Sequence, residues 1–161
     1  LPIEPIANGM KELVSGLTYD GNSRAVEAIM TTDTQVKEVA VQFELGGKTC
    51  TMGGMLKGSG MIHPNMATTL TFITTDVDIS AELLQKALSD VVKITLNRVS
   101  VDGDTSTNDM VCVLANGTAE NIPVTKENQD FEKFVNALYA VMMNLARKMA
   151  RKNLVCRNLG A

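Results

Sequence analysis

The spacing of apolar residues over positions 39–52 constrains the fold more than any other feature of the sequence. Gly46 and Gly47 separate two strand-like segments, the first with apolar residues at every second position. This period is typical of a strand with one buried face, and a two-glycine connection favours a tight β-hairpin. The apolar residues of the first segment are Val39, Val41, Phe43 and Leu45.

The segments before and after this hairpin show the apolar periodicity of helices. Apolar residues at i, i+3, i+4 and i+7 predict helices over 5–17, 24–32, 81–92 and 129–149, with Asp78 or Ser80 capping the third and Asn128 the fourth. β-branched segments predict further strands over 68–76, 94–101 and 109–117. We therefore expect one α+β domain in which helices pack on antiparallel sheets.

Composition excludes several classes of protein. The 161 residues carry a net charge of −3, with 45% hydrophobic and 20% charged residues, as in ordinary globular domains. The sequence has no basic stripe interleaved with aromatic residues, so we expect no nucleic-acid partner. Its apolar runs are too short to span a bilayer, and its start does not resemble a signal peptide. Because the first residue is Leu1, we expect a piece of a longer protein.

The cysteines do not form a recognisable metal or disulfide pattern. Cys50, Cys112 and Cys156 are odd in number and widely spaced, which favours small core residues in a reducing cytoplasm. The stretch from Asp102 to Asp109 is rich in Asp, Ser and Thr but lacks the spacing of a calcium loop. We expect a hydrogen-bonded turn there, and neither a metal nor a cofactor.

The stretch KGSGMIHPNMATTLTF, residues 57–72, is the part of the sequence that indicates a catalytic site. A glycine-rich loop, expected over 53–64, leads through the chain's single histidine, His63, to Ala67 and Thr68 at the start of a strand. A loop-packing role suits His63 better than catalysis, because it lacks triad partners. The small Ala67 leaves its carbonyl open to attack by the hydroxyl of Thr68.

Thr68 becomes an activated nucleophile if the Ala67–Thr68 bond is cut. A threonine hydroxyl needs a base, and a free α-amino group has a pKa of roughly 7.7–8.0. Cleavage would create that base on the same residue, following an acyl shift from nitrogen to oxygen and hydrolysis of the ester. The sequence therefore predicts self-cleavage between Ala67 and Thr68, with Thr68 as the catalytic residue.

Four segments resemble the ornithine acetyltransferase (glutamate N-acetyltransferase) family of arginine biosynthesis. They are AIMTTDT, GGMLKGSGMIHPNMAT, TFITTD and VDGDTSTNDMVCVLANG, which together run from about residue 28 to 117. The resemblance implies a layered, αββα-like sandwich of mostly antiparallel sheets flanked by helices, of the N-terminal-nucleophile type. The family's precursor cleaves itself before the threonine that matches Thr68.

The resemblance also implies a reaction and its site. Thr68 would take an acetyl group from N-acetylornithine and pass it to glutamate, and Lys57 would contact substrate; some members also accept acetyl-CoA as a donor. Residues 1–67 would end the α chain and residues 68–161 would begin the β chain, within one partial domain over 1–161. The two chains stay associated as a heterodimer and commonly assemble further. The loop 102–109 would support the site.

Alternatives remain open at this point. The family has Met where this chain has Thr69, its oxyanion-hole Thr-Gly pair lies upstream of Leu1, and its substrate-binding Glu lies downstream. A truncated, non-catalytic relative or partner subunit would fit these differences. An amidase or aminopeptidase with a self-cleaved N-terminal nucleophile would differ only in using water as acceptor. A truncated chain should also leave sheet edges and apolar helix faces uncovered.

Overall fold

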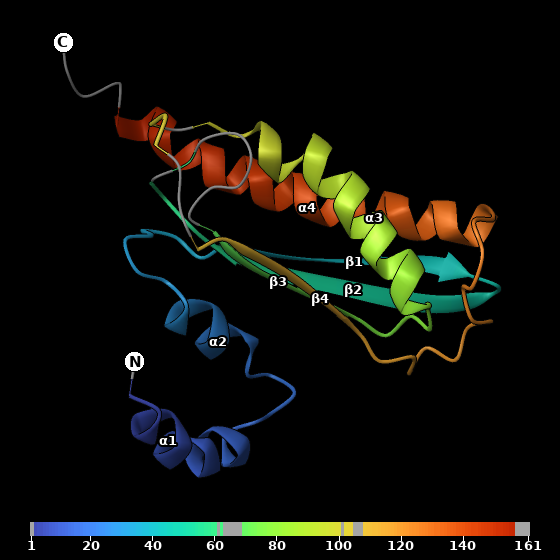
Figure 1. Cartoon of the computed structure of the whole chain (residues 1–161), viewed down its shortest axis with the longest axis horizontal. Helices are drawn as coiled ribbons and strands as arrows, with labels where there is room; N and C mark the ends of the chain where they lie inside the picture. Colours follow the sequence, from blue (N-terminus) through green and yellow to red (C-terminus); the bar gives the residue numbers. More distant parts are fainter. Residues whose placement is uncertain (1, 61, 63–68, 101, 105–107, 157–161) are drawn as a thin grey trace.

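The fold is seen in a computed structural model that describes residues 2–60, 62, 69–100, 102–104 and 108–156, the last five of these as backbone only. Helices and strands alternate in blocks along the chain (Figure 1). In order, the elements are α1 (Glu4–Ser15), α2 (Asn22–Ala28), β1 (Glu38–Leu45), β2 (Lys48–Lys57), β3 (Leu70–Thr75), α3 (Ala81–Ile94), the 3-10 helix η1 (Leu96–Arg98), β4 (Met110–Ala115) and α4 (Gln129–Cys156).

The four strands form one sheet in the order β1-β2-β3-β4. β1 pairs with β2 and β2 with β3 in antiparallel fashion, whereas β3 and β4 run parallel. The predicted hairpin is confirmed: Leu45 faces Lys48 across a turn in which Gly46 and Gly47 both have positive φ, +55° and +76°. Two positive φ angles suit the right-handed twist of the flanking strands and favour glycine.

Helices α3 and α4 cover one face of the sheet, and α1 and α2 lie on the other side (Figure 1). α4 runs along β1 and β2 and also packs against α3. The α+β architecture, with a mostly antiparallel sheet flanked by helices, is therefore confirmed. The described residues contain one sheet of the expected sandwich. None of the helices in these residues combines the length and apolar composition needed to cross a bilayer.

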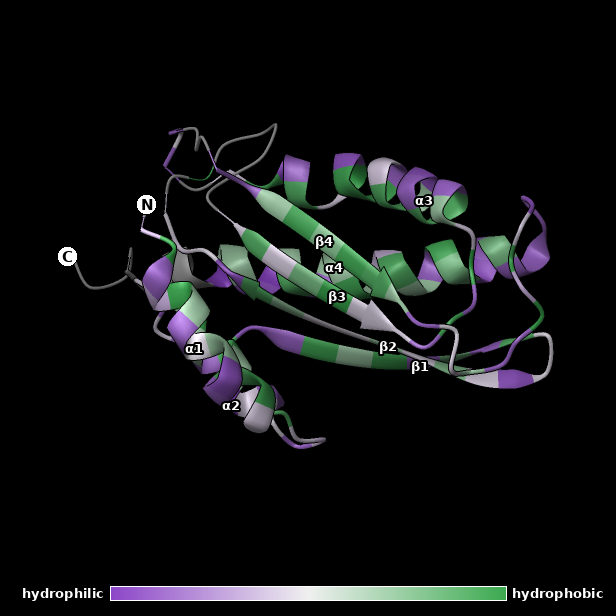
Figure 2. Cartoon of the chain, turned by 60° about the horizontal axis from the view of Figure 1, so that its bottom comes forward, coloured by the Kyte–Doolittle hydropathy of each residue, from purple (hydrophilic) through white to green (hydrophobic). Residues whose placement is uncertain are grey.

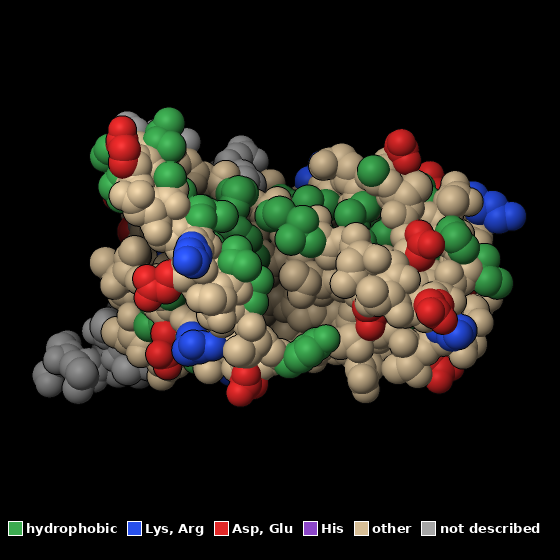
Figure 3. All heavy atoms as spheres, turned by 90° about the horizontal axis from the view of Figure 1, so that it is seen from below, with side chains coloured by type: hydrophobic (Ala, Val, Ile, Leu, Met, Phe, Trp, Pro, Cys, Tyr) green, Lys and Arg blue, Asp and Glu red, His purple; other side chains and the backbone are tan. Residues whose placement is uncertain are grey.

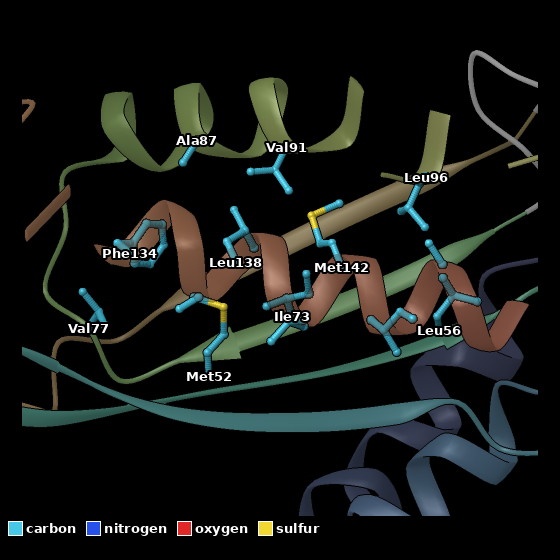
Figure 4. Packing of buried hydrophobic residues seen from close by; sticks show 14 of the residues in the cluster. Met52, Leu56, Ile73, Val77, Ala87, Val91, Leu96, Phe134, Leu138 and Met142 are labelled. Atoms are coloured by element: carbon cyan, nitrogen blue, oxygen red, sulfur yellow. The ribbon is translucent and has the colours of Figure 1, made fainter. Parts of the chain in front are cut away.

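The core lies between α4 and the sheet, with α3 closing its side (Figure 4). Its fully buried side chains come from one stripe of α4 and from alternate positions of the strands, as the two periodicities predict. The largest of them are Phe134, Leu138, Met142, Leu145, Met149, Leu45, Met52, Leu56 and Ile73.

Side-chain caps begin the two long helices at the predicted positions. Ser80 Oγ accepts a hydrogen bond from Leu83 N at 3.4 Å. Asn128 Oδ1 accepts one from Phe131 N at 3.0 Å. Each cap satisfies a backbone N–H that has no partner within its helix. Of the two candidates for α3, the cap is Ser80.

The strand predicted over 94–101 is wrong. α3 continues to Ile94, and η1 follows at once. Leu96 is buried in the core, and Thr95 Oγ1 donates to the carbonyl oxygen of Val91 at 2.7 Å. Burial of Leu96 outweighs the strand propensity of the β-branched residues around it. The connection from β3 through α3 returns to the sheet at β4, which explains why β3 and β4 are parallel.

β4 is apolar along its length and β3 in part (Figure 2), and apolar side chains gather on the outer face of the sheet, opposite α4 (Figure 3). Phe72 pairs in register with Met55 and Cys112, and Leu114 is 62% exposed. Cys112 is thus half-buried on this face rather than in the core, while Cys50 is buried as expected. None of the residues of α1 is buried. The expectation of uncovered apolar surface is confirmed for the described residues.

Gly53 and Gly54 lie within β2, so the glycine-rich loop does not begin at 53 as predicted. Gly54 faces α4, where a Cβ atom would meet Val141 Cγ1 at 2.9 Å and Leu145 Cδ1 at 3.2 Å. Gly53 faces outward, and its nearest such contact is Val39 O at 3.9 Å. Glycine at 54 therefore sets how closely α4 approaches the sheet.

Gly54→Ala should lower the free energy of unfolding by about 1–3 kcal/mol, because the added methyl group has to displace the buried Val141 side chain. Gly53→Ala is the matched control and should change stability by less than about 1 kcal/mol, since its methyl group enters open space. Urea unfolding of both variants measures the difference. Equal losses would contradict the close packing at Gly54.

Two buried threonines of β3 face α4 with different hydrogen bonding. Thr75 Oγ1 donates to Thr51 O at 2.8 Å. Thr71 Oγ1, between Leu56 and Val111 in the register, has no hydrogen-bond partner within the described part of the chain. Thr71→Val should therefore leave stability unchanged or raise it by up to about 1 kcal/mol, whereas Thr75→Val should lower it by about 1–2 kcal/mol. Thermal and urea unfolding distinguish these results; a loss at Thr71 equal to that at Thr75 would refute the assignment.

Candidate active site

The ends of two neighbouring strands meet where the sequence predicts chemistry. β2 ends at Lys57 and β3 begins at Leu70, and these two residues are register partners. The predicted nucleophile, Thr68, precedes Leu70 by two positions in the chain. His63, Ala67 and Thr68 lie outside the described residues. The site is therefore defined by the residues that hold the chain on either side of 63–68.

Lys57 is half-buried on the outer face of the sheet, beside the first residue of β3. Its side chain forms no ion pair with any described residue. A lysine ammonium group at this place is suited to bind a carboxylate through charge-assisted hydrogen bonds. The register thus brings the predicted substrate-binding lysine to the strand that follows Thr68.

The chain leaves Lys57 through a glycine held by a buried carboxylate. Gly58 has φ +151°, a region that favours glycine, and its N–H donates to Asp33 Oδ1 at 3.1 Å. The next residue, Ser59, shares a 2.5 Å hydrogen bond between its Oγ and Thr32 Oγ1. Two consecutive residues of the AIMTTDT segment therefore hold the start of the loop.

Asp33 forms a buried ion pair with Lys37. The two side chains are 0% and 3% exposed, and the backbone of Lys37 joins the sheet by accepting from Leu56 N at 2.9 Å. Burial raises the pKa of the Asp33 carboxyl. The Lys37 ammonium and the N–H groups of Gly58 and Thr31 outweigh that effect and hold the pKa below its usual value. Asp33 is therefore an ionised anchor at neutral pH.

On the other side of 63–68, the first described residue is held at both of its backbone groups. Thr69 N donates to Asp109 Oδ1 at 2.7 Å, and Thr69 O accepts from Met110 N at 3.0 Å. Thr69 is 2% exposed. The residue directly after Thr68 is thus fixed to the start of β4.

Asp102 holds Ile62, the residue before 63–68. Asp102 Oδ1 accepts from Ile62 N at 2.9 Å, and Ile62 is fully buried. The two ends of the loop 102–109 therefore contact the two flanks of the predicted cleavage segment. Within the described ranges, no group of three His, Cys, Asp or Glu side chains is arranged to hold a metal ion.

Sequence reasoning identified Lys57, and the resemblance implied that the loop 102–109 supports the site, but Asp33 and Lys37 were missed and Asp109 was not singled out within its loop. Asp33 stood in a segment that was notable only for its resemblance, and Asp109 stood at the end of the loop in which a hydrogen-bonded turn was expected. Their partners lie 25 and 40 positions away, and those partners are backbone N–H groups. No spacing rule predicts such pairs. The only local signal at Asp33 was a carboxylate between threonines, which is typical of many turns.

Comparison with known proteins gives consistent results. The model of the ArgJ family matches residues 1–153. The arginine biosynthesis bifunctional protein ArgJ of Listeria monocytogenes serotype 4b is 53% identical over 152 residues, and that of Halalkalibacterium halodurans is 50% identical over 151 residues. Each alignment covers 94% of this chain and 37% of the relative.

A crystal structure of the arginine biosynthesis bifunctional protein ArgJ from Bacillus halodurans is 49% identical to this chain. It matches with a TM-score of 0.49 over 51% of this chain and 38% of that protein. This chain spans 37% of the length of the two curated relatives named above. With a family match over residues 1–153 and about half of its residues identical to those relatives, the chain belongs to the ArgJ family.

Proposed function

We propose that the protein containing this chain is a cytoplasmic acetyltransferase of arginine biosynthesis, which moves an acetyl group from N-acetylornithine to glutamate. The relatives' names support a role in arginine biosynthesis. The observation that carries the proposal is the pairing of Lys57 with Leu70, since it puts a cation beside the strand that Thr68 precedes. The odd number and wide spacing of the cysteines in the sequence support the choice of a reducing compartment.

The first step of the proposal is self-cleavage. Thr68 Oγ attacks the carbonyl carbon of Ala67, the C–N bond to Thr68 breaks, and the released nitrogen takes up the hydroxyl proton. Water then hydrolyses the resulting ester, which leaves a carboxylate on Ala67 and a free hydroxyl and amine on Thr68. The α chain would end at Ala67 and the β chain would begin at Thr68.

The second step is acetyl transfer. The Thr68 amine accepts the proton of Oγ as the oxygen attacks the acetyl carbonyl of N-acetylornithine. The amide C–N bond breaks, the proton passes to the departing ornithine amine, and an acetyl-threonine ester remains. The amine of glutamate attacks that ester and regenerates Thr68. The same ester could form from acetyl-CoA, with the thiol leaving instead of the amine.

Contacts across the proposed cut support continued association of the two chains. β1 and β2 precede residue 67, whereas β3, β4 and α4 follow it. β2 pairs with β3 over six residues, and α4 packs on both β1 and β2. Backbone hydrogen bonds and the main hydrophobic core therefore join the two halves. We infer a heterodimer that remains intact after cleavage.

Intact mass of the wild-type protein should show two fragments that meet at Ala67 and Thr68 and that elute together in native size exclusion. Thr68→Ala should remain a single chain, because it lacks the attacking hydroxyl. Thr69→Val, which removes the adjacent hydroxyl, is the matched control and should still be cleaved. An uncleaved wild-type chain, or cleavage of Thr68→Ala, would refute the role of Thr68 as the nucleophile of self-cleavage.

Lys57→Met should raise KM for N-acetylornithine by about tenfold to a hundredfold, the range that the loss of one charged hydrogen bond gives. Lys48→Met removes an exposed lysine at the opposite end of the same strand and should leave KM unchanged. Steady-state kinetics with and without glutamate measure both effects. Product formation that is equally fast without glutamate would instead favour a hydrolase.

A further inference from the structure

Backbone N–H groups on both sides of residues 63–68 are bound by carboxylates from distant parts of the chain. Gly58 N donates to Asp33 at 3.1 Å, and Ile62 N donates to Asp102 at 2.9 Å. The shortest of these bonds, from Thr69 N to Asp109 Oδ1, measures 2.7 Å. Hydrogen bonds to ionised acceptors are shorter and stronger than those between neutral groups. Of these three bonds, the one to Asp109 has as its donor the residue that directly follows Thr68 in the chain.

The geometry of the peptide bond connects Asp109 with Thr68. The N–H of Thr69 lies in the same planar peptide group as the carbonyl of Thr68. A carboxylate that holds this N–H fixes the plane of that group. Met110 N holds the next peptide group through Thr69 O. The residue that follows Thr68 in the chain is therefore held at both of its backbone groups, by Asp109 at its N–H and by Met110 at its carbonyl.

We propose that Asp109 is a positioning residue for Thr68. It fixes the peptide that follows the nucleophile and so limits the orientations from which Oγ can attack, first at Ala67 and later at the acetyl donor. This inference rests on the proposed function, in which Thr68 is the nucleophile. Misplacement of a reacting group by about 1 Å can slow a reaction by a hundredfold, so a single anchor of this kind has a measurable effect.

The sheet contains an internal comparison for this proposal. Asp76 Oδ1 accepts from Thr51 N, also at 2.7 Å. Asp76 and Asp109 are both half-buried, and each binds a backbone N–H next to β3. Asp76 follows the last residue of β3, whereas Asp109 binds the residue before its first. Loss of either bond removes the same kind of interaction, but only one of them adjoins Thr68.

The test uses the full-length protein and measures the rate of self-cleavage alongside the melting temperature. Asp109→Ala should slow cleavage by about tenfold to a hundredfold. Asp109→Asn keeps an acceptor oxygen in place and should recover most of that rate. Asp76→Ala should lower the melting temperature as much as Asp109→Ala does and leave the cleavage rate unchanged. In matured protein, Asp109→Ala should lower kcat with KM for N-acetylornithine unchanged.

Cleavage of Asp109→Ala at the wild-type rate would overturn the proposal, as would equal slowing in Asp76→Ala and Asp109→Ala. If Asp109→Ala does not fold, Asp109→Glu replaces it, because this variant keeps the charge and moves the carboxylate oxygen by one methylene. Asp109→Glu should then cleave slowly, and cleavage at the wild-type rate would overturn the proposal. Failure of the wild-type protein to cleave would refute the proposed function itself. Cleavage in the wild type but not in Thr68→Ala, with Asp109→Ala unaffected, would refute only the role of Asp109.

Discussion

The close packing of α4 on the sheet is the contact on which the rest of the structure depends. α4 covers β1 and β2, and Gly54 lets it approach until Val141 and Leu145 fill the space where a side chain would otherwise stand. Because interiors are packed as densely as organic crystals, this distance is set by a single missing methyl group. The same contact joins the parts of the chain before and after residue 67, which are the two chains of the proposed enzyme.

With the sheet fixed in this way, the ends of β2 and β3 meet at a defined place. Lys57 and Leu70 become neighbours through register rather than through sequence proximity. Carboxylates from two other parts of the chain then bind the backbone beside 63–68: Asp33 on the β2 side, Asp102 next to Ile62 and Asp109 on the β3 side. A rigid sheet with anchored strand ends is the kind of support that a nucleophile at a strand start requires.

The periodicity of apolar residues predicted the elements that bury a single face. β1 and α4 each have one buried side, so the spacing of apolar residues in the sequence matches the burial seen in the structure. The turn after β1 was predicted from its paired glycines, which both have positive φ. Sequence pattern failed over 94–101, where the burial of Leu96 decided between strand and helix. It also placed Gly53 and Gly54 in a loop, because the reason for glycine at 54 is a side chain 87 positions later, Val141.

The sequence by itself determined the fold class, the Asn128 cap of α4 and the stretch proposed to hold the nucleophile, because these follow from local spacing, local hydrogen bonding and one long motif. It left the cap of α3 open between Asp78 and Ser80, and the structure decided for Ser80. Only the tertiary structure decided the direction of β4, the place of Lys57 beside Leu70, and the choice of Asp33, Asp102 and Asp109 as anchors. The physical reason is that a backbone N–H is the same in every residue. Which carboxylate it binds is therefore settled by the packing of the chain and cannot be deduced from the order of its side chains.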